Sequence, residues 1–508
     1  MKRLLLALAL LTLAPSTAAA ELEQGEKIPS VNYDGTQHLE YRFGPIDIKP
    51  GQNDIKFEPN NLKPQVPGYI TRFEPDLVYA DRKRGIPPVD VIHLHHGVWV
   101  VDLQPIFAAG EEKTILQMPR GFGWNHDPKS TWIMNHMIHN LLPNKDQVYI
   151  TYKIDFVPMD APAAQQIRPV KMKWMDVAGT DTWPVFDVKR RWANKEGTYT
   201  FPDEVRTAAE RAKIGPDHKW VPDKDVTLIG TAGHLHPGGL HTDLNAWRGP
   251  QKKLLFRSEA KYWEPAGAVS WDVAMTATQA DWLVRVKRND ILKVSATYDA
   301  KRASWYESMG IMPIFYYEGH DVGGTDPFEA PVKTTGSITN GRLPENDNHG
   351  GSKVILPDAR KMLTSGGARS SGALVEIRDF LYARGDLSLE GDAQRPPVVR
   401  PGQSLKFKNI DAAEDVYHTI TACKEPCNRD TGIAYPLADG RVDFDSGELG
   451  FGPEFATPTA GRDTWQTPKN LSKGTYTYFC RVHPFMRGAF RVKGESAAAK
   501  RRRAARKR

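Results

Sequence analysis

The chain has 508 residues, of which 40% are hydrophobic and 25% are charged. This length is enough for about three domains, and the balance is that of an ordinary globular protein rather than of a disordered chain. The formal net charge is +7, but residues 500–508 hold seven positive charges and Lys2 and Arg3 hold two, which leaves −2 for residues 21–499. We therefore expect no basic face for nucleic acid.

The first twenty residues have the pattern of a secretory signal peptide. Lys2 and Arg3 precede an apolar run at 4–13, and small residues end the segment at Ala20. The run is too short to cross a bilayer, and no later segment reaches the ~20 apolar residues of a transmembrane helix. We expect a signal peptide at 1–20, cleaved near Ala20, and a mature protein exported to the periplasm or outside the cell. A retained membrane anchor is the alternative.

Short runs rich in β-branched and aromatic residues alternate with turns along most of the chain. Clear examples lie at 148–157, 282–286 and 291–298. Such runs at short spacing predict antiparallel sandwiches or barrels rather than βαβ units. The best of the few helical patterns is short, at 204–213. The strand pattern weakens at 160–225, which favours a boundary between two β domains there.

Histidines gather in three places before residue 330, at 92–97, 132–140 and 233–241. In a strand, side chains at i and i+2 point to the same face, so His234 and His236 can bind one metal. His93 and His95 can do likewise, and adjacent His95 and His96 can converge if the strand bends. Imidazole suits copper, zinc, iron or nickel, and the lack of nearby cysteine or a carboxylate pair favours copper or zinc. Hydrogen-bonded histidines in a β core are the alternative.

Residues 40–325 resemble the copper type II, ascorbate-dependent monooxygenases, the family of peptidylglycine α-hydroxylating monooxygenase and dopamine β-monooxygenase. His95-His96, followed by Val-Trp-Val at 98–100, resembles the family's His-His pair, and His234-Leu-His236 resembles its His-x-His. Met309, eight residues before a tyrosine, resembles its thioether ligand. The resemblance implies two jelly-roll-like β-sandwich domains, at 21–190 and 191–325.

The same resemblance implies two coppers with different tasks. A copper at His234, His236 and Met309 would be the catalytic site, where O2 is reduced and a C–H bond is hydroxylated, and a copper at His95 and His96 would relay an electron. The family's third ligand to the relay copper falls on the strand at 148–156, where this chain has no histidine. His139 or His136 is the expected substitute, and Met312 is the alternative to Met309. The family's disulfides are absent, because no cysteine precedes residue 423.

Three Gly-Gly pairs lie among Asn, Asp, Ser and Thr at 321–372, which predicts a linker at 326–372. After it, the segment 476–488 reads YTYFCRVHPFMRG, and His418 stands some sixty residues before it. A thiolate and two imidazoles in a plane, with a weak axial thioether, form a blue-copper electron-transfer site. We therefore predict His418, Cys480, His483 and Met486 as the ligands of a type 1 copper.

This segment resembles the cupredoxins, and the amicyanin group in particular, which share the run HPFMRG and the same ligand spacing. The resemblance covers about 373–494 and implies a Greek-key β-sandwich domain at 373–495. Cys423 and Cys427 lie just after the first ligand. A local disulfide is the first interpretation of this pair, and binding of another ion is the second. Residues 496–508 are expected to form a basic, disordered tail.

The sequence as a whole predicts an all-β, exported multi-copper protein. The favoured function is a copper-dependent monooxygenase-like redox enzyme with a fused type 1 copper electron-transfer domain, and one or two further coppers in the N-terminal region. The alternative is a non-enzymatic copper protein that transfers electrons or stores and handles copper. An unidentified redox partner or reductant is expected, and a small molecule or a peptide would be the substrate.

Overall fold

The computed structural model describes residues 28–340, 374–422, 444–450 and 462–494, apart from short gaps. These gaps lie at 50–51, 53–54, 90, 142–143, 181–183, 263–267, 269–270, 272, 302–303, 390–393, 415, 481–482 and 484. The predicted signal peptide, most of the predicted linker, the Cys423/Cys427 pair and the basic tail lie outside the described residues. No helix in the described part of the chain is long and apolar enough to cross a membrane.

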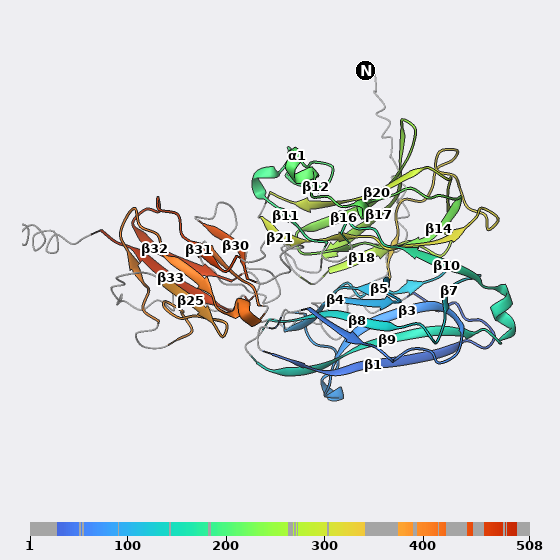
Figure 1. Cartoon of the computed structure of the whole chain (residues 1–508), viewed down its shortest axis with the longest axis horizontal. Helices are drawn as coiled ribbons and strands as arrows, with labels where there is room; N and C mark the ends of the chain where they lie inside the picture. The colour runs from blue at the N-terminus through green and yellow to red at the C-terminus, as the bar shows by residue number, and fades with distance from the viewer. Residues whose placement is uncertain are drawn as a thin grey trace, which may run out of the picture.

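The described chain is nearly all β, as predicted. Figure 1 shows two sandwiches stacked on each other, the first coloured blue to cyan and the second green to yellow, with a third, orange-to-red unit at one end. The α-helix described is α1 (Ala208–Arg211), and short 3-10 turns lie at η1 (Arg82–Arg84), η2 (Pro162–Gln166), η3 (Arg190–Trp192), η4 (Pro216–His218) and η5 (Asp411–Glu414).

The helix predicted at 204–213 is therefore much shorter than expected. The Glu204 carboxylate accepts a hydrogen bond from the backbone N–H of Thr200 at 2.6 Å, and this bond holds Glu204 in a turn before the helix. Thr207 then starts the helix as its N-cap, with its hydroxyl oxygen 3.1 Å from the Glu210 nitrogen.

The first sandwich packs a short sheet against one end of a long one. The short sheet has the order β2 (Ile55–Pro59), β8 (Trp132–Asn140), β4 (Ile92–Val101), β5 (Gln104–Ala109). The long sheet has the order β1 (Gln37–Ile48), β9 (Asp146–Pro158), β3 (Gly68–Tyr79), β7 (Phe122–His126), β10 (Arg168–Lys173), β23 (Ile314–Glu318), β14 (Val226–Thr231), β19 (Val284–Val286), with β6 (Leu116–Gln117) beside β3.

Strand β9 shows why the period-two pattern gave the correct fold class. Its side chains Val148, Ile150, Tyr152, Ile154 and Phe156 are all fully buried, because alternate residues of a strand face one side of the sheet. Each such burial stabilises the fold by roughly 1.5–3 kcal/mol before entropic losses are counted.

The second sandwich uses the far end of the long sheet. Its facing sheet has the order β12 (Thr198–Phe201), β20 (Ile291–Asp299), β16 (Gly239–Arg248), β17 (Gln251–Tyr262), β18 (Val273–Ala277), β24 (Ser337–Ile338), with β13 (Lys219–Trp220) beside β20. Two small pairs join β11 (Phe186–Val188) to β21 (Trp305–Ser308) and β15 (His234–Leu235) to β22 (Gly310–Ile311).

The two sandwiches are joined through strand β10, which pairs in parallel with β7 and antiparallel with β23. Ile229 and Phe315, from the second sandwich, belong to the buried core of the first. The first part of the predicted linker also packs here, since Ile338 is buried and the Thr339 hydroxyl accepts from the Ile115 N–H at 2.9 Å.

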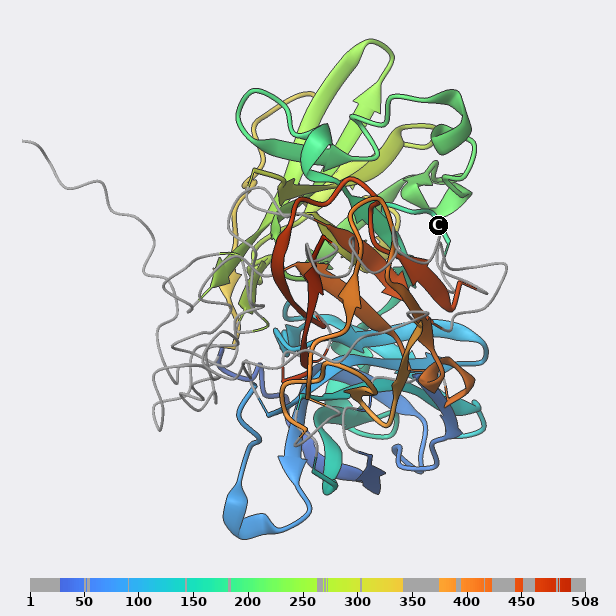
Figure 2. The same cartoon turned by 90° about the vertical axis from the view of Figure 1, so that its left-hand side faces the viewer.

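The C-terminal unit consists of two sheets that enclose one core. One has the order β26 (Leu381–Tyr382), β25 (Leu374–Arg378), β28 (Lys406–Asn409), β31 (Thr464–Gln466). The other has the order β27 (Val398–Val399), β33 (Arg487–Val492), β32 (Gly474–Phe479), β29 (His418–Ala422), β30 (Asp445–Leu449). Figure 2 shows this unit in front of the seam between the two sandwiches.

Candidate copper centres

The C-terminal unit brings together the residues predicted to bind type 1 copper. His418 begins β29, and Cys480 follows the end of β32 directly. The Nδ1 atoms of His418 and His483 lie 3.2 Å apart, and each lies 3.8 Å from the Cys480 sulfur. Met486 is buried in the same core as Cys480, and its N–H donates to the His483 carbonyl at 2.9 Å.

This triangle has the size that a bound metal requires. With metal distances of ~2.05 Å to nitrogen and ~2.3 Å to sulfur, as in zinc sites, a trigonal plane places the nitrogens ~3.6 Å apart and nitrogen ~3.8 Å from sulfur. The thiolate, two imidazoles and a nearby thioether are also the donor types of a type 1 copper site. The residues therefore fit the metal in both geometry and chemistry.

Neighbouring groups hold the triangle in place. His418 Nε2 lies 2.9 Å from Asp411 Oδ2, which leaves Nδ1 to face the triangle. The Thr419 N–H points at the Cys480 sulfur at 3.3 Å. Burial alone would raise the pKa of Asp411, but the hydrogen bond with His418 lowers it below its usual value, so this carboxylate is ionised at neutral pH.

A second group of potential ligands comes from the short sheet of the first sandwich. His93 and His139 are directly opposed on β4 and β8, and one ring nitrogen of each lies within 4.8 Å of one nitrogen of His95. A third group joins His95 and His96 to His236 of the second sandwich, within the same limit. His95 belongs to both groups.

A β-bulge explains how adjacent His95 and His96 come to share a site. The register between β4 and β8 shifts between Leu94 and His96, so His95 is the extra residue. A bulge bends the strand and turns the side chains that follow it. The strand bend considered from the sequence is therefore present. We call His93, His95, His96, His139, His234 and His236 together the histidine cluster.

The second sandwich supplies His234 and His236 with fixed ring orientations. His236 Nδ1 donates to the Glu307 carbonyl at 2.5 Å, and its Nε2 lies 3.1 Å from His96 Nε2. His234 Nδ1 lies 3.0 Å from Glu112 Oε2 of the first sandwich. His234 is beside the third group rather than within it, with its ring centroid 5.6 Å from that of His96 and 5.2 Å from that of His236.

The histidine cluster has the chemistry of a metal site. Burial lowers the pKa values of His93, His95, His96 and His236 well below the usual value, so these rings are neutral, the form that binds metal. Within the described part of the chain, His93 Nε2, His95 Nδ1 and His234 Nε2 are buried without a hydrogen-bond partner. Such buried polar atoms normally find a partner, and a metal ion would provide one.

Met309 lies next to the cluster through its backbone. The Tyr298 hydroxyl accepts from the N–H groups of both His236 and Met309, at 3.2 and 3.1 Å. The Met309 side chain is buried with Trp174 and Ile311. The structure thus places Met309 beside His236, and its role as a ligand stays a prediction.

The three units meet where the histidine cluster approaches the C-terminal triangle. The ring centroids of His139 and His483 are 5.7 Å apart, and the two rings are nearly perpendicular. His139 belongs to the second group and His483 to the triangle, so this contact joins two candidate metal sites from different parts of the chain.

About a quarter of the chain is similar to solved cupredoxins. A mutant of amicyanin in its Cu(I) form matches with 17% identity over 28% of this chain and 94% of its own, with a TM-score of 0.15. A purple cupredoxin from Nitrosopumilus maritimus matches with 20% identity over 24% of this chain and 99% of its own, also with a TM-score of 0.15. No protein-family model and no curated protein matches the chain.

Other histidines from the three sequence clusters lie elsewhere. His136, the alternative to His139, has its Nε2 3.0 Å from Glu58 Oε2, while His139 takes the place beside His93. His241 faces Asp243, with 3.2 Å between Nδ1 and Oδ1. Neither belongs to a candidate metal group among the described residues.

His93 was considered from the sequence as a partner of His95 in binding a metal, and the structure places both in one candidate group. Two residues beside the cluster were not predicted. Glu112 carried no signal, since its partner His234 is distant in the sequence. The Trp271 ring packs 4.9 Å from His93, 4.4 Å from His95 and 5.1 Å from His236, centroid to centroid, and only the fold reveals this.

Proposed function

We propose that this protein is a multicopper redox enzyme. In this proposal, the C-terminal type 1 centre passes electrons to copper held by the histidine cluster, and a monooxygenase-like oxidation takes place there. The contact between the His139 and His483 rings is the observation that carries the proposal. It gives the two candidate centres a through-space junction with no intervening residue.

Copper at the cluster would supply one-electron redox chemistry and a place for O2 to react. Neighbouring groups in this chain orient the histidine rings and cover them. His236 is held by the Glu307 carbonyl, and Glu112 holds His234, so both rings have a fixed tautomer and orientation. Trp271 packs over the histidine rings and excludes water from that side.

The overall reaction of a monooxygenase fixes what the partners must be. One oxygen atom of O2 enters a substrate C–H bond, and the other leaves as water. This balance takes two protons and two electrons, and we propose that an external reductant delivers the electrons one at a time through the type 1 site. An exported protein, as the N-terminal pattern predicts, would draw on a periplasmic or extracellular reductant.

The test uses purified, copper-loaded full-length protein. The type 1 centre is first reduced without oxygen, and its visible band is then followed after O2 is mixed in. His139→Gln should slow the return of this band at least tenfold, because changes around a metal site typically lower activity by ~10–100-fold. The shape of the band should stay the same, because His139 is not one of the predicted type 1 ligands. His136→Gln is the matched control, because it changes the same strand but lies outside the cluster.

Copper content and O2 uptake decide between the proposal and its alternative. The enzyme should hold more than one copper per chain and consume O2 with a reductant. A simple electron carrier would hold one copper, and a copper store would fill the cluster without O2 uptake. An unchanged reoxidation rate in His139→Gln would show that electrons do not pass through this contact.

A further inference from the structure

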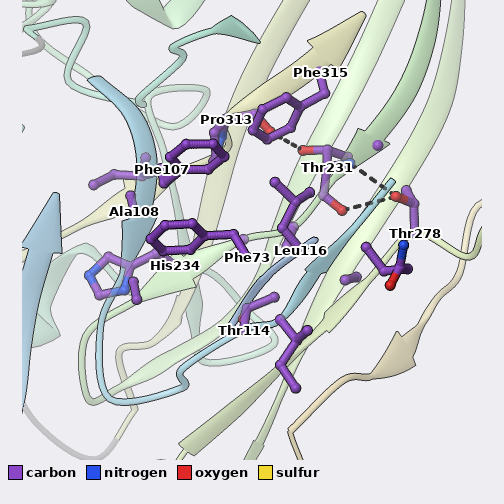
Figure 3. Close-up of a pocket in the computed structure, with 18 of the residues that line it drawn as sticks. Phe73, Phe107, Ala108, Thr114, Leu116, Thr231, His234, Thr278, Pro313 and Phe315 are labelled. Atoms are coloured by element: carbon purple, nitrogen blue, oxygen red, sulfur yellow. Dashed lines mark hydrogen bonds between the residues drawn. The ribbon is translucent and has the colours of Figure 1, made fainter. Parts of the chain in front are cut away.

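A cavity of about 90 Å³ lies at the seam between the two sandwiches, next to the histidine cluster. Figure 3 shows its walls, which come from β3, β5 and β6 on one side and from β14 and β23 on the other. His96 and His234 line the cavity and also belong to the cluster. A molecule in the cavity would therefore lie against the proposed site of oxidation.

The walls are mostly apolar. Aromatic and aliphatic side chains form the greater part of them, including Phe73, Phe107, Leu116 and Phe315. No lysine or arginine side chain contributes to the lining among the described residues. An anionic ligand would therefore lose its hydration without gaining a counter-charge, which is strongly unfavourable.

Most polar groups in the lining are already engaged. The Thr231 hydroxyl donates to the Pro313 carbonyl at 2.8 Å, and the Thr278 hydroxyl donates to the Thr231 carbonyl at 3.2 Å. Glu112 accepts from the Gly110 N–H at 2.8 Å and from His234. A cationic ligand would have to displace these bonds to reach the carboxylate.

One hydroxyl in the lining has no such bond. Thr114 Oγ is buried and has no hydrogen-bond partner within the described residues. Buried hydroxyls without a partner are uncommon in native proteins, and a ligand with one polar group would satisfy this one. The cavity thus offers a large apolar surface and one hydrogen-bonding position.

We propose that this cavity is the substrate pocket, and that its substrate is a small, uncharged, mainly apolar molecule with at most one hydrogen-bonding group. The volume is below the ~150 Å³ of an engineered apolar cavity that holds benzene or xenon, so the substrate is no larger than benzene. The pocket does not fit a peptide, the other substrate class expected from the sequence. This inference rests on the proposed function, because it takes the cluster as the reacting site.

The test probes the cavity with xenon, followed by ¹²⁹Xe NMR on metal-free and copper-loaded protein. We expect saturable binding in both forms. Ala108→Leu, which fills the cavity from β5, should weaken xenon binding at least tenfold. Ala161→Leu is the matched control, because Ala161 is equally half-buried but lies outside the cavity.

Competition then tests the ligand class. Butan-1-ol and butyrate have the same chain length and differ in charge. The neutral butan-1-ol should displace xenon, and the anionic butyrate should not. Thr114→Val should weaken butan-1-ol binding and leave xenon binding unchanged. Absence of saturable xenon binding, equal binding in Ala108→Leu, or displacement by butyrate would overturn the pocket assignment.

The experiments can refute the pocket assignment and the proposed function independently of each other. If the cluster holds copper and receives electrons but xenon does not bind, the pocket assignment is wrong and the proposed function stands. If xenon binds to the metal-free protein but the cluster takes no copper, the proposed function is wrong. In the copper-loaded protein, butan-1-ol should alter the EPR signal of the cluster and leave the type 1 signal unchanged, and an unchanged cluster signal would contradict the substrate role.

Discussion

The buried carboxylate of Glu112 should control both the stability of the seam and copper binding at His234. It accepts hydrogen bonds from the Gly110 N–H at 2.8 Å and from His234 Nδ1 at 3.0 Å. Burial alone would raise its pKa, but the electrostatic attraction and the hydrogen bond between Glu112 and the His234 ring lower it below the usual value, so Glu112 is ionised at neutral pH. Glu112→Gln keeps the shape and the bond from Gly110, but it turns an amide N–H toward His234.

The magnitude follows from these two bonds. A hydrogen bond to a charged group contributes ~1.5–3 kcal/mol and a neutral one ~1 kcal/mol, so weakening both bonds in Glu112→Gln should cost about 1–4 kcal/mol. If the two sandwiches unfold together, as a unit of about 300 residues, that lowers Tm by roughly 1.5–6 °C. The amide N–H also requires an unprotonated Nδ1 on His234, so the ring proton moves to Nε2. Changing the hydrogen-bond partner of a metal ligand typically lowers metal affinity by ~10–100-fold.

The assay measures each effect by itself. Calorimetry of the metal-free protein gives the stability change, and copper titration with EPR gives the affinity of the cluster. Glu111→Gln is the matched control for the copper titration, because the neighbouring carboxylate is paired with Lys113. If Glu112→Gln binds copper at the cluster as tightly as the unmodified protein, His234 is not a ligand and the reasoning is refuted.

The remaining predictions concern the type 1 centre and a buried acid. Cys480→Ser should abolish the intense visible band of the oxidised protein, because that band requires the thiolate, and a band that persists would contradict the assignment. Met486→Leu should keep copper and colour and raise the reduction potential measured by redox titration, since losing the thioether favours Cu(I). Burial raises the pKa of Glu111 to about 8, so its contribution to stability is complete below its unfolded pKa of about 4.5 and is lost as pH rises through about 8. Urea unfolding between pH 5 and about 9 should show this loss in the unmodified protein and a flatter profile in Glu111→Gln.

Local patterns in the sequence were enough to predict the fold class and the side chains that the C-terminal unit brings together. The alternation along 148–157 marks a strand whatever its partners are. Cys480, His483 and Met486 lie within one short loop, so their spacing alone predicts that they meet. His418 was predicted from its place some sixty residues before this loop, in the ligand order of the cupredoxins, and the structure places its Nδ1 3.2 Å from that of His483.

The N-terminal site depended on information that no local pattern holds. The bulge at His95 arises from the register of β4 against β8, and register is set by tertiary packing. Glu112, His234 and Trp271 converge only after two sandwiches have docked. The contact of His139 with His483 requires the docking of a third unit, so the sequence predicted two candidate centres but not the contact between them.

The strand pairing through β10 has a consequence for dividing the protein. A chain cut at residue 190 would retain β10 and lose β23, so the backbone groups that pair at Lys171 with Tyr316 and at Lys173 with Ile314 would become an open sheet edge. Open edges recruit strands from other molecules and promote aggregation. The first core would also lose Phe315. The two sandwiches should therefore unfold in one cooperative transition, and the smallest unit that can be produced in soluble form should contain both.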